Sequence, residues 1–203
     1  KRHYHLDWFA ETGRLYQVQF LIHKDQAALL LDTSGAGLHK RGYRQNAVEA
    51  PLKETLAAAL AAISHVRTDA NFYDPCCGSG TILIEAAMYA MHMAPGLQRH
   101  FSAEHWPQVP PALWQRERDR ARSLVLRDAK FQAFGSDIDD AAVRLTLDNA
   151  RKAGVIAHVR AQKADLADFA PATEHGCVIC NPPYGERLLD LKQAEAIYRT
   201  MGR

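Results

Sequence analysis

Residues 71–85, NFYDPCCGSGTILIE, constrain the fold most, because they combine the patterns of a short strand, a glycine-rich turn and the start of a helix. Gly78 and Gly80 allow backbone angles that a Cβ would forbid. Ser79 or Thr81 is expected to cap the helix. The N–H groups at the start of such a helix favour an anionic or carboxylate-bearing ligand. The GxG spacing lacks the third glycine of the dinucleotide fingerprint and the lysine of a P-loop, so a tight turn without a ligand is the alternative.

Strands and helices alternate along much of the chain. Further strands are expected at 133–137, 158–162 and 176–180, and further helices at 49–63, 112–128, 141–153 and 193–201. This alternation is typical of an α/β fold with a parallel sheet. Ligands of such folds bind beyond the carboxyl ends of the strands. Four polar residues fall at these ends, namely Asp74, Asp137, Asp165 and Asn181.

Residues 1–45 predict a small β-rich lead-in before this α/β region. Two apolar runs, 15–22 and 26–32, flank a short charged turn and suit a hairpin. The basic segment 38–44, LHKRGYR, has two interpretations. It is either a solvated connector or a contact to a phosphate or cofactor.

The return from the first α/β helix to the second strand is long for a connection of this kind. Prolines interrupt residues 94–111 and the charged helix at 112–128 follows, so we expect an insertion at about 94–130. A solvated amphipathic helix is the simpler interpretation of this segment. An arm that contacts the substrate is the alternative.

Composition limits the class of protein. A chain of 203 residues with 47% hydrophobic residues can form one good-sized domain with a small appendage. The formal net charge of +2 neither requires nor excludes a nucleic-acid partner. No apolar run has the length of a membrane span, and the first residues lack the pattern of a signal peptide. The chain begins without methionine and ends within a pattern, so we expect a fragment of a longer protein.

The four cysteines, Cys76, Cys77, Cys177 and Cys180, form a vicinal pair and a Cys-x2-Cys pair. Such spacing can indicate zinc. The second pair, however, lies in an apolar run that suits a buried strand, where a spacing of three places the side chains on opposite faces. We therefore expect free, buried, reduced thiols in a cytoplasmic protein, and no metal site.

The polar strand ends together indicate a ligand with several hydrogen-bonding parts. Asp137, after the second strand, is placed to accept hydrogen bonds from ribose hydroxyls, as an acid does in dinucleotide-binding folds. Asp165, after the third strand, can accept from the exocyclic amine of an adenine. The glycine turn and the helix start would then face the amino-acid end of the ligand.

The fourth strand runs into Asn181, Pro182, Pro183 and Tyr184. Consecutive prolines fix the backbone and remove its donors. Asn181 Oδ1 and the Pro182 carbonyl can together accept both hydrogens of an exocyclic amine on a base. The nitrogen then becomes more tetrahedral and directs its lone pair at an electrophilic methyl group, without a general base. Tyr184 can stack on the base, which must leave any helix to reach the site; a rigid loop without chemistry is the alternative.

These motifs resemble a known family. Residues 74–80, DPCCGSG, with 181–184, NPPY, resemble the S-adenosylmethionine (SAM)-dependent amino-methyltransferases. With further segments they resemble, more narrowly, the RlmL/YcbY-type bacterial 23S ribosomal RNA guanine-N2 methyltransferases, a family also labelled N6-adenine-specific DNA methylases. The further segments are 32–35, 38–44, 50–54, 80–87, 94–96 and 181–187.

The resemblance implies a Rossmann-like sheet with strand order 3-2-1-4-5-7-6, and SAM as the cofactor. The last three strands would lie outside this chain. Residues 46–203 would form the methyltransferase domain, and residues 1–45 would link it to a preceding RNA-binding region of the THUMP type. The helix that begins near residue 50 would lie against the methionine end of the cofactor.

The resemblance also assigns roles to residues. Residues 74–81 would surround the methionine moiety, Asp137 would bind the ribose and Asp165 the adenine. The candidate cofactor-binding residues are Asp74, Cys76, Gly78, Ser79, Gly80, Thr81, Asp137, Ile138, Asp165, Leu166 and Asn181. The residues expected to bind the target amine are Asn181, Pro182, Pro183 and Tyr184.

The expected function is therefore methyl transfer from SAM to the exocyclic N2 amine of a guanine in ribosomal RNA. Two alternatives stay open. One is an N6-adenine methyltransferase that acts on DNA or RNA, because the same site would serve either amine. The other is a module that binds SAM or RNA without catalysis.

Overall fold

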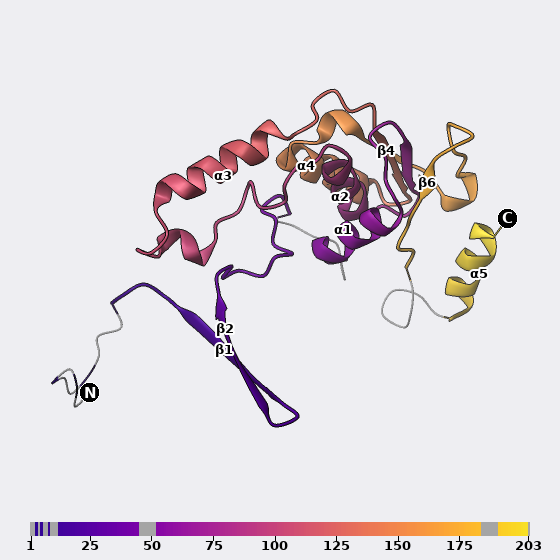
Figure 1. The fold of residues 1–203 in the computed structure, drawn as a ribbon. Helices are drawn as coiled ribbons and strands as arrows, with labels where there is room; N and C mark the ends of the chain where they lie inside the picture. The colour runs from indigo at the N-terminus through magenta and orange to yellow at the C-terminus, as the bar shows by residue number, and fades with distance from the viewer. Residues whose placement is uncertain are drawn as a thin grey trace. The chain divides into compact units, whose positions relative to one another are not determined.

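The computed structural model describes His3, His5, Trp8 and residues 12–44, 52–183 and 191–202. The chain divides into two compact units. The first contains residues 1–38 and 100–117, and the second contains residues 39–99 and 118–203. Figure 1 shows the helices and strands of both units.

A β-hairpin forms the strands of the first unit (Figure 1). In it, β1 (Gln17–His23) pairs antiparallel with β2 (Gln26–Asp32). The two residues between the strands, Lys24 and Asp25, have φ angles of 50° and 59°. Positive φ at both central positions is typical of the type I′ turn, whose twist matches that of the flanking strands. The hairpin predicted from the sequence is confirmed.

Aromatic side chains organise the rest of the first unit. The 3-10 helix η2 (Ser102–His105) is followed by Trp106, whose ring stacks on that of Tyr16 with centroids 4.9 Å apart. Trp106 Nε1 also donates a hydrogen bond to the Leu15 carbonyl at 3.0 Å. These contacts join the segment after residue 100 to the segment before β1.

The second unit is built on a parallel four-stranded sheet. In chain order its strands are β3 (Asn71–Asp74), β4 (Gln132–Asp137), β5 (Val159–Lys163) and β6 (Cys177–Val178). Their order across the sheet is β5-β4-β3-β6. Counted from β3 this order is 3-2-1-4, which agrees with the first four positions of the predicted sheet. β6 is shorter than the strand predicted at 176–180, although the Ile179 N–H still bonds to the Tyr73 carbonyl at 3.0 Å.

The helices are α1 (Glu54–Ile63), α2 (Thr81–Ala90), α3 (Pro111–Ser123), α4 (Asp140–Ala153) and α5 (Leu191–Met201), with the short 3-10 helices η3 (Ile156–His158) and η4 (Leu166–Asp168). Of the ten residues in α2, nine are buried. This helix packs against β3, β4, α1 and α4. Leu83, Ile84 and Phe131 are among the fully buried side chains of the surrounding core. The helix that follows the glycine turn is therefore held firmly on all sides.

Helix α4 begins and ends close to its predicted limits. Asp139 Oδ1 accepts a hydrogen bond from the Ala141 N–H at 2.8 Å and so caps the helix. Gly154 ends it with a φ angle of 79°, in the left-handed region that glycine adopts at helix ends. Residues next to each other in sequence were therefore sufficient to predict the limits of this helix.

Helix α1 begins at Glu54, which is later than predicted. Lys53 is extended, and residues 49–51 of the predicted helix lie outside the described part of the chain. The Arg44 guanidinium donates a hydrogen bond to the Leu52 carbonyl at 2.8 Å. This bond, between residues eight positions apart, stabilises the extended backbone before the helix, and the pattern of the helix itself gave no sign of it.

Helix α3 is the charged helix of the predicted insertion. None of its residues is buried. Its charges form exposed ion pairs within the helix, between Arg116 and Glu117 and between Arg122 and Asp119. An exposed helix of this kind fits both interpretations of the insertion, which stay predictions.

No helix in the described part of the chain has the length and apolarity needed to cross a membrane. Within the same residues, no group of three His, Cys, Asp or Glu side chains is arranged to hold a metal ion. All four cysteines are free thiols. Only Cys77 is buried, so the prediction of burial is wrong for Cys76, Cys177 and Cys180. Cys76 lies in a loop, and the other two lie in or after β6, the outermost strand on its side of this sheet.

Candidate active site

The turn between β3 and α2 depends on its two glycines. Gly78 and Gly80 have φ angles of 54° and 76°, in the left-handed region that favours glycine. Gly80 is the N-cap of α2, and no side chain caps this helix. The predicted cap by Ser79 or Thr81 is therefore wrong, because their two hydroxyl groups bond to each other instead, at 3.1 Å. The N–H groups at the start of α2 are left without a capping side chain.

Two buried side chains of α4 brace this turn. Thr146 Oγ1 donates to the Gly78 carbonyl at 2.9 Å, and Asn149 Nδ2 donates to the Ser79 carbonyl at 3.0 Å. Both side chains are fully buried. Thr146 also requires a glycine at Gly80, because a Cβ added there would lie 2.7 Å from Thr146 Cγ2. Sequence reasoning missed both residues, although polar residues three apart on the buried face of a helix were a usable signal.

Asp74 ends β3 and is 1% exposed. Its Oδ1 accepts a hydrogen bond from the Cys76 N–H at 3.1 Å. Burial raises the pKa of the Asp74 carboxyl to about 7, with the Cys76 N–H acting to lower it and the charge of Asp137 acting to raise it. This carboxyl therefore titrates near neutral pH, and a cationic ligand group beside it would favour its charged form.

Asp137 fastens the turn to β4. Its Oδ2 accepts from the Gly78 N–H at 2.9 Å, and its Oδ1 accepts from the Asp139 N–H at 3.0 Å. A carboxylate has about four lone-pair positions, so these two bonds leave room for further donors. Asp137 is half-buried, and Ile138 after it is 68% exposed. The end of β4 thus offers a carboxylate and an apolar side chain to a ligand.

Asp165 lies after β5 and is exposed. Its Oδ1 accepts from the Ala167 N–H at 2.8 Å and so caps η4. A helix cap accounts for this bond by itself, and the second carboxylate oxygen is the group to consider for a ligand. Leu166, the next residue, is half-buried.

Cys76 marks the point where the strand ends meet. The pKa of its thiol is raised to about 12, first by burial and then by the charges of Cys180, Asp74, Asp137 and Asp165. Electrostatic effects of this kind fall off with distance. In the parallel sheet Asp74 pairs with Gly135, Asp137 pairs with Lys163, and the Ile179 N–H bonds to the Tyr73 carbonyl, so the carboxyl ends of these strands lie along one edge. The structure brings these strand ends together, as the strand–helix alternation predicted.

Asn181, Pro182 and Pro183 follow β6 at this edge of the sheet. Pro182 is buried, and its two neighbours are half-buried. The backbone bond between the end of β6 and β3 keeps the segment beside the strand that ends at Asp74. Tyr184, the fourth residue predicted to bind the target amine, lies outside the described residues.

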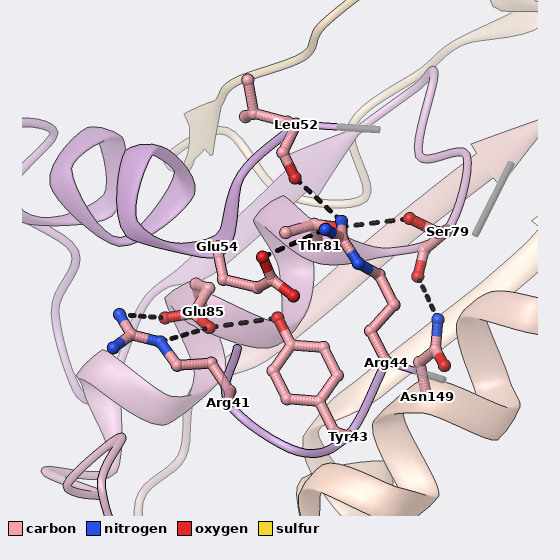
Figure 2. Close-up of polar contacts among 9 residues, drawn as sticks. All are labelled: Arg41, Tyr43, Arg44, Leu52, Glu54, Ser79, Thr81, Glu85 and Asn149. Carbon is pink, nitrogen blue, oxygen red and sulfur yellow. Dashed lines mark hydrogen bonds and ion pairs between the residues drawn. The ribbon is translucent and has the colours of Figure 1, made fainter. Parts of the chain in front are cut away.

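Part of the basic segment before α1 points inward, whereas its Lys40 is exposed. Arg41 and Tyr43 are buried, and Arg44 is half-buried. Arg41 and Tyr43 contact the carboxylate of Glu85, and Arg44 contacts that of Glu54 (Figure 2). The polar groups of these three side chains bind carboxylates of this chain, so they do not form a solvated surface. A contact of the segment to a phosphate or cofactor stays a prediction. Sequence reasoning missed the two glutamates, each of which is the buried acid of an otherwise largely apolar helix.

Comparison with known proteins identifies the family. Residues 41–203 match the family described as RMKL-like, methyltransferase domain. The chain belongs to this family. The match covers the whole four-stranded sheet, the glycine turn and the segment after β6. The resemblance inferred from the sequence motifs is confirmed.

Two curated relatives of this RMKL-like domain are similar over most of the chain. One is "Putative RNA methyltransferase YpsC" of Bacillus subtilis (strain 168), which is 43% identical over 197 residues, 97% of this chain and 51% of YpsC. Another is "Ribosomal RNA large subunit methyltransferase K/L" of Shewanella baltica (strain OS195), which is 44% identical over 179 residues, 86% of this chain and 25% of that protein. The chain thus spans about half the length of YpsC.

A solved structure agrees with the RMKL-like family. It is "SMU.472, a putative methyltransferase complexed with SAH", where SAH is S-adenosylhomocysteine, the product that SAM leaves after methyl transfer. It has 43% sequence identity and a TM-score of 0.87, and it covers 95% of this chain and 50% of that chain. The predicted Rossmann-like methyltransferase fold is confirmed, and SAM is the cofactor of this methyltransferase family.

The residues at the carboxyl edge of the parallel four-stranded sheet are suited to bind SAM. The uncapped N–H groups at the start of α2 suit the carboxylate of its amino-acid part. The Asp137 carboxylate, with lone pairs to spare, suits a pair of ribose hydroxyls. The glycine turn brings the main chain close to this position without a Cβ in the way.

Proposed function

We propose that the protein is an RNA methyltransferase that transfers a methyl group from SAM to the N2 amine of a guanine in ribosomal RNA, with 23S RNA as the substrate. One observation carries this proposal. Asn181 and Pro182 lie at the sheet edge where the glycine turn, Asp137 and Asp165 also meet. The name of the relative from Shewanella baltica supports the choice of RNA.

The cofactor would be held by the residues around the three strand ends. The N–H groups at the start of α2 would bind its carboxylate, Asp137 its ribose and Asp165 its adenine amine. When bound, SAM supplies an electrophilic methyl group on a positively charged sulfur. The other residues proposed to contact it are Asp74, Cys76, Gly78, Ser79, Gly80, Thr81, Ile138, Leu166 and Asn181.

The target amine would be held by Asn181 and Pro182. An exocyclic amine is a poor nucleophile because its lone pair is delocalised into the ring. Asn181 Oδ1 and the Pro182 carbonyl each accept one of its hydrogens, which favours a tetrahedral nitrogen whose lone pair faces the methyl group. The proton leaves after the transfer, because the methylated nitrogen is strongly acidic. Pro183 holds the backbone rigid, and stacking of the base on Tyr184 stays a prediction.

The rest of the chain has a supporting part in this proposal. Residues 1–45 would connect the methyltransferase domain, residues 46–203 with an insertion at about 94–130, to a region that binds RNA. An enzyme that modifies ribosomal RNA would act in the cytoplasm. The first statement rests on the family resemblance, and the second follows from the proposed substrate.

Mass spectrometry of nucleosides from 23S ribosomal RNA tests the proposal. RNA from a strain without the protein should lack one N2-methylguanosine, which the intact protein should restore. Asn181→Ala should fail to restore it. Asn71→Ala is a matched control, because Asn71 lies at the opposite, amino end of β3, where it bonds to Thr173; this variant should restore the methyl group fully.

Two results would overturn the proposed chemistry. Loss of N6-methyladenosine in place of N2-methylguanosine would assign adenine as the base. An unchanged nucleoside content, or full activity of Asn181→Ala, would remove Asn181 from its proposed role and favour a module that binds SAM or RNA without catalysis.

A further inference from the structure

Two arginine–glutamate pairs are buried between the basic segment and the helices α1 and α2. Arg41 Nε lies 3.4 Å from Glu85 Oε1, and their side chains are 10% and 2% exposed. Arg44 Nη2 lies 3.0 Å from Glu54 Oε2, and their side chains are 11% and 4% exposed. Figure 2 shows the two pairs, with Tyr43 between them. Because the two ion pairs are similar and begin on one short segment, the roles of Arg41 and Arg44 can be compared directly.

Burial of these charges is not an efficient way to stabilise a fold. Removing an ion pair from water costs about as much as the attraction returns, and an apolar pair of similar volume often stabilises equally well. Burial indeed raises the pKa of Glu85, against the opposing effects of Arg41 and Tyr43. A role in fixing one arrangement of the chain therefore explains these pairs better than a gain in stability.

The two arginines differ in what else they hold. Arg44 Nη1 donates to the Leu52 carbonyl at 2.8 Å and to Thr81 Oγ1 at 3.1 Å, in addition to its pair with Glu54. Thr81 is the first residue of α2. Arg41 instead contacts Glu85, one helical turn further along α2. Arg44 thus contacts the end of α2 that adjoins the glycine turn, and Arg41 contacts the helix one turn further on.

The bond from Arg44 connects to a second hydrogen bond, between Thr81 and Ser79. A guanidinium can only donate, so Thr81 Oγ1 accepts from it. The proton of the Thr81 hydroxyl is then available to Ser79 Oγ, 3.1 Å away. On the other side of the turn, Asn149 holds the Ser79 carbonyl. The turn is therefore fixed from both sides, by Arg44 through Thr81 and by α4 through Asn149.

We propose that Arg44 is a positioning residue for the cofactor: its guanidinium holds Thr81 and the backbone at Leu52, and so keeps the glycine turn in the conformation that binds SAM. The inference rests on the proposed placement of SAM at this turn. A turn that is already fixed loses less entropy when it binds a ligand. Removal of the contact should therefore weaken binding of the cofactor, without contact between Arg44 and SAM itself.

The test compares Arg44→Lys with Arg41→Lys in the intact protein. Lysine keeps the charge but loses the planar fork, so it cannot hold Glu54, Thr81 and Leu52 together. Isothermal titration with SAH gives the dissociation constant, and thermal unfolding gives the stability of each variant. Arg44→Lys should raise the dissociation constant about tenfold, as expected for one lost charge-assisted hydrogen bond, and Arg41→Lys by less than about twofold.

Both variants weaken a buried ion pair, so both should lower the unfolding temperature, Arg44→Lys by more because it also loses the bonds to Leu52 and Thr81. Kinetics provide a second readout. Arg44→Lys should raise KM for SAM and leave kcat at saturating SAM within about twofold. Unchanged SAH binding in Arg44→Lys, or equal losses of binding in both variants, would overturn the inference.

Thr81→Val keeps the test decisive should Arg44→Lys fail to fold. It removes the hydroxyl that Arg44 holds and leaves the pair with Glu54 in place. It should weaken SAH binding about tenfold. Where Arg44→Lys does fold, the double variant should lose little more, because both changes remove the same contact. Unchanged binding in Thr81→Val, or fully additive losses, would contradict the proposed route through Thr81.

Failure of the inference can be told apart from failure of the proposed function. If Asp137→Asn binds SAH like the wild type, the proposed placement of the cofactor at the turn is wrong, and the inference about Arg44 is wrong with it. Loss of SAH binding in Asp137→Asn, with Arg44→Lys unaffected, would overturn only the role of Arg44. Binding results as expected, with no N2-methylguanosine formed, would overturn only the proposed reaction.

Discussion

Replacement of Gly80 by alanine should destabilise the methyltransferase domain by about 2–5 kcal/mol, from two separate causes. The first is the backbone, because a φ angle of 76° costs a residue with a Cβ about 1–2 kcal/mol. The second is packing, because the new Cβ would lie 2.7 Å from Thr146 Cγ2 and 2.9 Å from Thr146 Oγ1. An extra methyl group forced into a packed core costs about 1–3 kcal/mol.

Gly154 provides a matched control for the backbone cause. Its φ angle is 79°, but no atom lies within 4 Å of a Cβ built there. Gly154→Ala should therefore cost only about 1–2 kcal/mol. The difference between the two variants measures the packing of Thr146 against the glycine turn.

Urea unfolding of the intact protein gives both free energies of unfolding. Gly80→Ala should be less stable than Gly154→Ala by about 1–3 kcal/mol. It should also bind SAH weakly, whereas Gly154→Ala should bind SAH like the wild type. Equal stability of the two variants would refute the reasoning, because it would show that Thr146 moves aside at no cost.

Three further predictions concern buried groups near the turn. Burial raises the pKa of Asp74 from 3.8 to about 7, so between these values the folded state keeps a proton that the unfolded state has lost. The contribution of the Asp74 carboxyl to the free energy of unfolding should therefore fall by up to about 4 kcal/mol as the pH rises from about 4 to about 7, and level off above. Urea titrations of Asp74→Asn should lack this fall. The same pH dependence in Asp74→Asn and the wild type would contradict the burial argument. Asn149→Ala should cost about 1–3 kcal/mol and weaken SAH binding, because it releases the Ser79 carbonyl; urea unfolding and titration with SAH together check it, and unchanged values for both would show that the brace is dispensable. Burial raises the pKa values of Cys76 and Cys77 to about 12. Iodoacetamide at pH 8 should therefore label both thiols slowly in the folded protein and rapidly in urea. Rapid labelling of the folded protein, measured by mass spectrometry, would disprove this prediction.

Local patterns were enough to predict much of the fold. The hairpin at Lys24 and Asp25 and the limits of α4 at Asp139 and Gly154 depend on residues next to each other in sequence. The order of the first four sheet strands came from the family resemblance, and it agrees with the structure. The strand ends could be expected to meet because the carboxyl ends of parallel strands share one edge of a sheet.

The errors share a physical cause, which is contact between residues far apart in the chain. The partners of Arg44 were missed, because the sequence does not show that Glu54 and Thr81 lie within its reach. The cap of α2 was assigned to Ser79 or Thr81, whereas the hydroxyl of Thr81 is engaged by Arg44 and by Ser79. A side chain's partner across the core cannot be read from its neighbours in sequence.

The same cause explains which site residues were missed. Thr146 and Asn149 act through the carbonyls of Gly78 and Ser79, more than sixty residues earlier. Their place on the buried face of an amphipathic helix could have marked them as groups in need of a partner. The identity of that partner required the structure.

A crystal structure of the intact protein with SAH would test the central claim most directly. The account predicts SAH at the carboxyl edge of the sheet, with its carboxylate at the first N–H groups of α2, its ribose hydroxyls on Asp137 and its adenine beside Asp165 and Leu166. Asn181 should face the sulfur across the space that the base would occupy. SAH bound elsewhere, or a complex in which Asp137 bonds to Gly78 and Asp139 but not to the ribose, would contradict the account.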